Sequence, residues 1–113
     1  MKRFYTRSEI QTLLSSNPLK APVSYLDREG SPVDNYILYM RMTPRSVLRA
    51  DNGVHIRKVN IQVVHLHRKK LDSIEEFMIA NFGIEPSAFN VKQEDTDFWG
   101  TYYEFECFTK GSW

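Results

Sequence analysis

Cysteine and long apolar segments are scarce in this chain. Its 113 residues include one cysteine, Cys107, so no internal disulfide can form and synthesis in a reducing cytoplasm is the default. No apolar run approaches the length of a membrane span, and the start, Met-Lys-Arg-Phe-Tyr, lacks the apolar stretch of a signal peptide. We therefore expect no membrane partner, and we expect Cys107 to be a small buried hydrophobe in a strand.

The sequence also lacks the motifs of common enzyme sites. Its five glycines are dispersed singly, so no glycine-rich loop can cradle a phosphate, and no Gly-x-Ser-x-Gly elbow is present. His65 and His67 share one face of a predicted strand, but a zinc site requires three or four ligands, and His55 lies well away from the pair. We expect neither an enzyme nor a bound metal or cofactor.

The chain does contain enough apolar material for one folded domain. Hydrophobic residues make up 42% of the sequence and aromatic residues 13%, which excludes a disordered chain. A length of 113 residues suits one domain and is too short for two, so residues 1–113 are expected to form a single domain.

Residues 36–68 show the pattern of one unusually long β-hairpin. Asn52-Gly53 between two extended runs is a strong signal for a two-residue turn, which would place Asp51 opposite Val54 and Ile37 opposite Arg68. A return strand over residues 54–67 would span roughly 45 Å. A compact domain of this length has a radius of gyration of only about 13 Å. The hairpin, at about residues 43–58, is therefore expected to overhang the body as an arm.

Local patterns predict two helices and the remaining strands. A capping box, Thr6-Arg7-Ser8-Glu9, predicts a helix that ends at Asn17-Pro18. Asp72-Ser73-Ile74-Glu75 predicts a second cap, with Gly83 stopping the helix that follows. Strands are expected at residues 22–26, 35–42, 89–94 and 102–108. The predicted fold is α+β, with a mostly antiparallel sheet of four to five strands, a long protruding β-hairpin and two helices packed on one face.

The net charge of +1 hides a strong segregation along the chain. Residues 41–70 carry eight basic residues and one acidic residue, whereas residues 71–108 carry nine acidic residues and one basic residue. Opposite charges on one subunit can complement each other head to tail, which is the arrangement that closes rings. Alternatively, the two halves neutralise each other within the fold.

The overhanging arm and the tryptophans indicate a surface for subunit or partner contacts. An exposed ladder edge requires a partner, and large aromatic side chains dominate desolvated contacts. The alternative for the turn aromatics is that Phe98 or Trp99 caps the core. The candidate interface residues are Arg45, Arg49, Asn52, His55, Arg57, Lys58, Trp99 and Trp113.

A small nucleic-acid-binding or other adaptor module is the competing interpretation of the basic hairpin. Basic residues near Tyr36 and Tyr39 on a sheet can bind phosphates and stack on bases. However, the sequence has no glycine-aromatic RNA-binding signature, and the acidic second half would repel a polyanion. We therefore expect no sequence-specific binding of nucleic acid.

Residues 36–108 resemble the tail-completion proteins of long-tailed bacteriophages, also called tail-terminator or tail-to-head joining proteins. The resemblance covers about two-thirds of the chain and lies in the order and spacing of its segments. In chain order these are Tyr36-Ile37-Leu38-Tyr39, Ala50-Asp51-Asn52-Gly53, Val59-Asn60-Ile61-Gln62-Val63, Lys69-Lys70-Leu71-Asp72 before a helix bearing Glu75, Gly83-Ile84, and Tyr102-Tyr103-Glu104-Phe105-Glu106. The chain departs from the family pattern at Val64-His65-Leu66-His67, where the family has a tyrosine-threonine type of ending.

The resemblance implies a virion protein of the head-tail junction that is made in the host cytoplasm. It implies a homo-oligomeric ring, typically a hexamer, that is seated on the head-proximal end of the tail tube. Such a ring contacts the tail tube protein on one side and the head-closure or connector protein on the other. The neighbouring roles of head-closure or tail-tube-like protein remain open alternatives. Our hypothesis is that the basic arm from Arg45 to Lys58 contacts a neighbouring subunit or the tube end.

Overall fold

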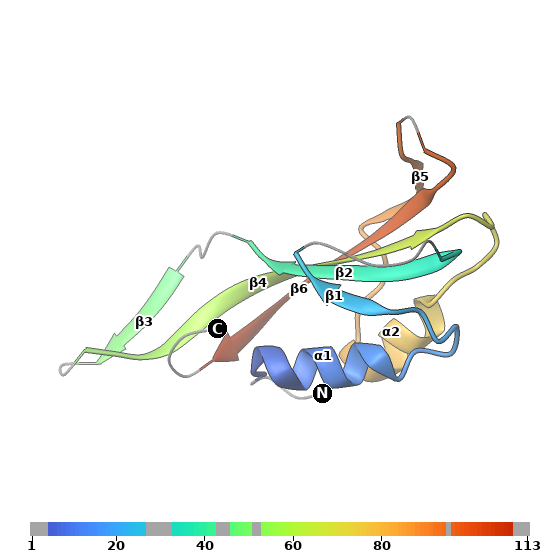
Figure 1. Cartoon of the computed structure of the whole chain (residues 1–113). Coiled ribbons are helices and arrows are strands. Elements are labelled where there is room, and N and C mark those ends of the chain that lie inside the picture. Colours follow the sequence, from blue (N-terminus) through green and yellow to red (C-terminus); the bar gives the residue numbers. More distant parts are fainter. Residues whose placement is uncertain (1–4, 27–32, 43–45, 51–52, 95, 110–113) are drawn as a thin grey trace.

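The structure is a computed structural model and describes residues 5–26, 33–42, 46–50, 53–94 and 96–109 (Figure 1). In chain order the elements are α1 (Arg7–Ser15), β1 (Val23–Tyr25), β2 (Asn35–Arg41), β3 (Ser46–Ala50), β4 (Gly53–His67), α2 (Glu75–Phe82), β5 (Ala88–Lys92) and β6 (Trp99–Thr109). The predicted α+β fold with a mostly antiparallel sheet is confirmed.

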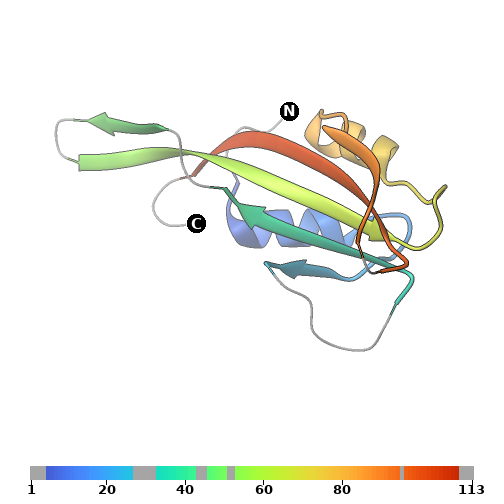
Figure 2. The ribbon, with the colours of Figure 1, turned by 90° about the horizontal axis from the view of Figure 1, so that it is seen from above.

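One mixed sheet contains all the described strands. Five of them lie in the order β1-β2-β4-β6-β5, and β3 pairs with β4 as well. The β1–β2 pair is parallel, and the other strand pairs are antiparallel. The sheet therefore has β1 at one edge and β5 at the opposite edge, with β4 and β6 in its centre (Figure 2).

The long strand β4 sets the length of the molecule. Its 15 residues pair with β2 and β6 in the body and with β3 beyond the body. The principal dimensions are 51 × 26 × 22 Å, and the radius of gyration is 15.1 Å, compared with about 13 Å for a compact domain of this size. Figure 1 shows β3 and the start of β4 projecting from one end of the sheet.

The pairing register differs from the prediction. Ala50 pairs with Gly53 and Arg49 with Val54, so Gly53 is the first residue of β4, whereas the sequence placed it in the turn. In the body, Ile37 pairs with His65, where the sequence predicted Arg68. The turn itself accounts for two of the three positions of this shift, because Ala50 rather than Asp51 begins the pairing. A bulge between Leu48 and Arg49 moves the register back by one position. Arg41 and Ser46, five positions apart, pair with Ile61 and Lys58, three positions apart, which adds the other two positions.

Helix α1 begins as the sequence predicts. The Thr6 hydroxyl accepts a hydrogen bond from the Glu9 amide at 3.1 Å, and the Glu9 carboxylate accepts one from the Thr6 amide at 3.0 Å. These two bonds form the predicted capping box. The helix ends at Ser15, just before Asn17-Pro18.

Helix α2 begins later than the sequence predicts. Asp72 is not its N-cap, because the helix starts at Glu75 and the cap residue is Ile74, which forms no side-chain capping bond. Ile74 is buried, and the Asp72 carboxylate accepts a hydrogen bond from Asn35 at 3.1 Å instead. Burial of Ile74 and the bond to β2 therefore decide the helix start. Gly83 ends the helix in the left-handed conformation, as predicted.

The core lies between the helices and one face of the sheet. Buried residues of α1 and α2, among them Ile10, Leu14, Met78 and Phe82, belong to one cluster with the odd-numbered residues of β2, β4 and β6. Figure 1 shows both helices below the sheet. The side chains of β6 alternate between the core and solvent: Tyr103, Phe105 and Cys107 are buried, as expected for Cys107, whereas Glu104 and Glu106 are exposed.

Near the end of β4 both faces of the sheet are covered. Val64 and Leu66 are buried on one face, and His65 and His67 are buried on the other. The pairing with β2 and β6 continues through these residues without a shift. This part of β4 is therefore an unbroken strand that is buried on both faces.

Replacing Phe82 with alanine should reduce the free energy of unfolding by about 3–5 kcal/mol. The Phe82 ring is 1% exposed and lies 5.0 Å from the Phe105 ring and 5.9 Å from the Tyr5 ring, between centroids. Urea unfolding followed by circular dichroism measures the loss. The control is Ile79→Ala on the exposed side of the same helix, which should cost about 1 kcal/mol or less. Equal losses for the two variants would contradict this placement of the core.

Candidate assembly surface

The arm consists of β3 and the first residues of β4. The last residue of β4 to pair with β6 is Arg57, opposite Thr109, so residues 53–56 pair only with β3 in the described part of the chain. The outer edge of β3 has no strand partner among the described residues. A row of unpaired backbone N–H and C=O groups is a template for another strand.

The structure divides the predicted interface residues between two ends of the molecule. Arg49 lies in β3, and His55, Arg57 and Lys58 lie in β4, so these four belong to the arm or its base. Trp99 begins β6, at the opposite end of the sheet. Arg45, Asn52 and Trp113 lie outside the described residues. Trp99 is therefore not part of the same contact surface as the arm.

Lys58, at the base of the arm, forms an ion pair within the chain. Its ammonium nitrogen lies 2.7 Å from a Glu106 carboxylate oxygen, and the two side chains are 44% and 56% exposed. An exposed pair of this kind contributes at most about 1 kcal/mol. At this position the basic and acidic halves of the chain do neutralise each other, and Lys58 is less available to a partner than the sequence suggests.

Trp99 is flanked by two lysines. The Lys70 and Lys92 nitrogens lie 5.2 Å and 5.3 Å from the centroid of its ring. Lys92 also donates a hydrogen bond to the Thr96 carbonyl oxygen at 2.9 Å. The attraction between a cation and an aromatic ring contributes about 0.5–1 kcal/mol at exposed sites. The half-buried Trp99 ring is thus fixed at the surface by intramolecular contacts.

A second cation–aromatic group at this end was not predicted. The Arg68 guanidinium lies 5.1 Å from the Phe98 ring centroid, and the Phe98 ring meets the Tyr36 ring edge-on at 5.3 Å. Arg68 also approaches Asp34, at 3.7 Å. These residues are distant in sequence, and only the pairing register brings Tyr36 near Arg68 and Phe98. Phe98 meets Tyr36 on the face of the sheet that points away from the core cluster, and it is not among the described hydrophobic residues that pack against that cluster, so these contacts do not support a core-capping role.

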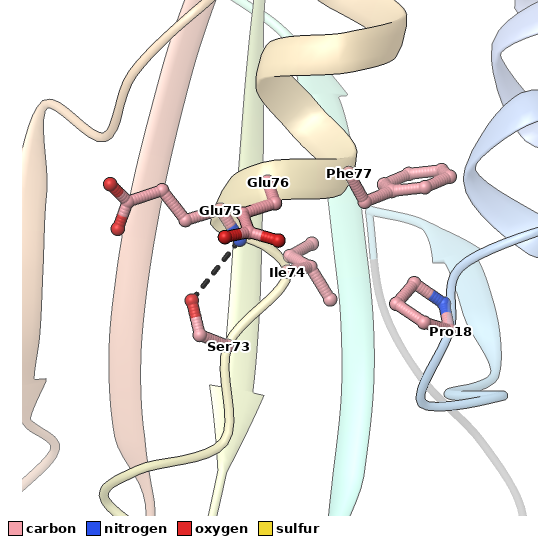
Figure 3. Close-up of a pocket in the computed structure, with 6 residues that line it drawn as sticks. All are labelled: Pro18, Ser73, Ile74, Glu75, Glu76 and Phe77. Atoms are coloured by element: carbon pink, nitrogen blue, oxygen red, sulfur yellow. Dashed lines mark hydrogen bonds between the residues drawn. The ribbon is translucent and has the colours of Figure 1, made fainter.

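A surface hollow lies at the start of α2. It has a volume of about 330 Å³ and is lined by Pro18, Ser73, Ile74, Glu75, Glu76 and Phe77 (Figure 3). The Ser73 hydroxyl accepts a hydrogen bond from the Glu75 amide at 3.1 Å. The two carboxylates sit in the first helical turn, where the helix dipole favours negative charge. Glu75 and Glu76 are therefore explained as residues that stabilise the start of α2.

His65 and His67 form a buried stacked pair. Their ring centroids are 4.6 Å apart. His65 Nε2 donates to the Asn35 side-chain oxygen at 2.9 Å, and His67 Nδ1 donates to the Lys69 carbonyl oxygen at 2.7 Å. Among the described residues His65 Nδ1 has no hydrogen-bond partner, and no group of three or more potential metal ligands is found there. The pair acts structurally, joining β4 to β2 and to the segment that leads to α2.

Burial and the neighbouring His67 lower the pKa of His65 from 6.5 to about 4. Desolvation is the larger cause, because the ring is fully buried and its charged form would lose hydration. Burial likewise raises the pKa of the Cys107 thiol to about 11, so this thiol stays protonated and unreactive.

None of the helices in the described ranges is long and apolar enough to cross a membrane.

Comparison of the chain with protein-family models, with curated proteins and with solved structures gives no match.

The stability of the fold should decrease as the pH falls from 6.5 to 4. The folded-state pKa of His65 lies below its ordinary value, so in this range the unfolded chain binds more protons than the folded chain. The expected loss is about 3 kcal/mol at most, from about 1.4 kcal/mol per pH unit. Urea unfolding at several pH values measures it. His65→Gln removes the titrating ring, so this variant should show a flatter profile between these pH values. An unchanged profile would show that other groups cause the pH dependence.

Proposed function

We propose that this protein is a virion structural subunit of a long-tailed bacteriophage. In this role it caps the head-proximal end of the tail tube and joins the tail to the head connector as a homo-oligomeric ring, typically a hexamer. The resemblance of residues 36–108 to tail-completion proteins supports the proposal, and so does the shape of the subunit, whose arm projects from a 51 Å long molecule.

The observation that carries the proposal is the unpaired strand edge of the arm. In the described part of the chain, β3 pairs on one side only, and residues 53–56 of β4 pair only with β3. Monomeric proteins usually shorten, charge or cover such edges, because they recruit other strands. An arm with an open edge is suited to lie on a neighbouring subunit, and repetition of that contact around an axis closes a ring.

Nucleic-acid binding remains the second candidate, and one observation favours it. Lys70 and Lys92 lie over the Trp99 ring, and Arg68 lies over the Phe98 ring. Proteins that bind single-stranded nucleic acid combine basic and aromatic side chains in this way. The same end also carries Glu94 and Asp97, which oppose a polyanion. If the protein shifts the electrophoretic mobility of a labelled oligonucleotide, and if the binding weakens steeply with salt concentration, this candidate is favoured over the ring.

Reversing the charge of the arm should abolish ring formation and tail joining. The double variant Arg49→Glu with Arg57→Glu places negative charge on the arm that we propose contacts a neighbour or the tube. The monomer should remain folded, because both positions lie in the overhanging part or at its junction with the body. The measurements are native mass by sedimentation, circular dichroism, and addition of the protein to purified headless tails of the phage that encodes it.

The matched control reverses two exposed lysines of the body, Lys20→Glu with Lys69→Glu. This variant has the same change in net charge and should still assemble and join tails. If the arm variant joins tails as well as the control, the arm is not the contact surface. If wild-type protein adds to no tail, the proposed function is wrong.

A further inference from the structure

The edge strand β5 presents apolar side chains to solvent. β5 pairs only with β6 in the described part of the chain, so its outer backbone edge is open. Phe89 is 51% exposed and Val91 is 42% exposed. An open strand edge that also exposes large apolar residues is a surface for another strand.

A bulge restricts what this edge can accept. The pairing shifts between Ala88 and Val91, and Asn90 has a φ of 49°, which interrupts the regular ladder. The Asn90 amide donates to the Thr101 hydroxyl at 3.3 Å, so a side chain helps to hold the irregular backbone. Bulges prevent indiscriminate pairing of edges. A partner strand must therefore be recognised by side chains as well as by the backbone.

Three exposed carboxylates lie in and next to the segments that flank β5. Glu85, Glu94 and Asp97 are exposed, and none of them forms an ion pair with another described residue. Three basic residues also lie here: Lys70 and Lys92 over the Trp99 ring, and Arg68 over the Phe98 ring. Because Glu94 and Asp97 form no ion pair with another described residue, a docking strand that brings positive charge beside these two carboxylates is favoured.

The arm of the same chain has the matching properties but cannot reach this edge. β3 has the sequence Ser-Val-Leu-Arg-Ala, with two apolar residues and an arginine, and like β5 it is five residues long. β2 and β3 pair along one edge of β4, and β6 pairs along the other, so the outer edges of β3 and β5 lie on opposite sides of the sheet. Figures 1 and 2 show the arm at one end of the molecule and β5 at the other.

We propose that the β5 edge receives the β3 strand of a second copy of this chain. The β3 backbone pairs with the open edge of β5, and the arm, whose sequence carries Arg49 and Arg57, brings positive charge to the end of the sheet that carries Glu94 and Asp97. Because donor and acceptor are different surfaces at opposite ends, the contact is head to tail and each subunit can give one arm and receive one. This inference rests on the proposed ring and names the acceptor surface for the arm.

Charge-swap rescue tests the proposal. The arm variant Arg49→Glu with Arg57→Glu and the acceptor variant Glu94→Lys with Asp97→Lys should each weaken self-association by roughly a hundredfold or more, because like charges then meet. A chain that carries all four substitutions should recover the wild-type oligomer. Sedimentation in low salt measures native mass, and circular dichroism confirms that each variant is folded.

The matched control reverses another acidic pair, Glu75→Lys with Glu76→Lys at the start of α2, and should leave the oligomer intact. If this control loses the oligomer while the acceptor variant keeps it, the arm docks at α2 and the proposal is wrong. Failure of the four-fold variant to recover the oligomer also overturns it. So does a wild-type chain that stays monomeric at near-millimolar concentration in low salt.

A cross-linking experiment locates the contact independently of charge. A protein with Val47→Cys mixed with one carrying Phe89→Cys should form a disulfide-linked heterodimer on mild oxidation, and neither alone should dimerise as readily. Native Cys107 is 3% exposed and stays out of the reaction. Absence of the mixed dimer overturns the proposal. Tail addition is assayed separately: protein that cross-links as expected but adds to no tail would retain the acceptor surface and disprove the proposed function.

Discussion

The continuous pairing of β4 with its neighbours is the constraint on which the rest of the structure depends. Its body half is hydrogen-bonded on both edges, by β2 and β6, and this fixes which residues face the helices. The other end runs past β6 and leaves the arm with a single partner strand. β4 thus contributes both to the core and to the candidate assembly surface. The two parts of the strand differ in how many strands pair with them: two in the body and one in the arm.

The polar groups under the sheet reinforce this arrangement. His65 and His67 occupy positions that would otherwise hold apolar side chains, and their hydrogen bonds reach Asn35 of β2 and the backbone of Lys69. Asn35 in turn binds Asp72, which leads into α2. Buried polar groups are costly unless they are hydrogen-bonded, so this chain of contacts specifies one way of joining β2, β4 and α2.

Features that depend on local residue patterns could be predicted from the sequence, and features that depend on pairing could not. The capping box at Thr6, the left-handed Gly83 and the alternation of β6 each involve neighbours within a few residues. The register of the hairpin depends on extra residues in the outgoing chain and a bulge at Leu48–Arg49, which no local signal fixes. For the same reason the Tyr36–Phe98–Arg68 contacts could not be predicted from the sequence, and the open edge of β5 with its exposed Phe89 and Val91 was found only from the strand order.

The geometry of the β4–β6 ladder also determines how the subunit responds to mechanical load. A pull on the arm acts along the axis of β4, parallel to the strands and across a ladder that runs from Arg57–Thr109 to His67–Trp99. Hydrogen bonds that are loaded in shear share the force and must break together, whereas bonds that are loaded at one end of a ladder break one after another. When a subunit is held by its arm, the whole β4–β6 ladder therefore resists the pull, and the helices carry little of the tension.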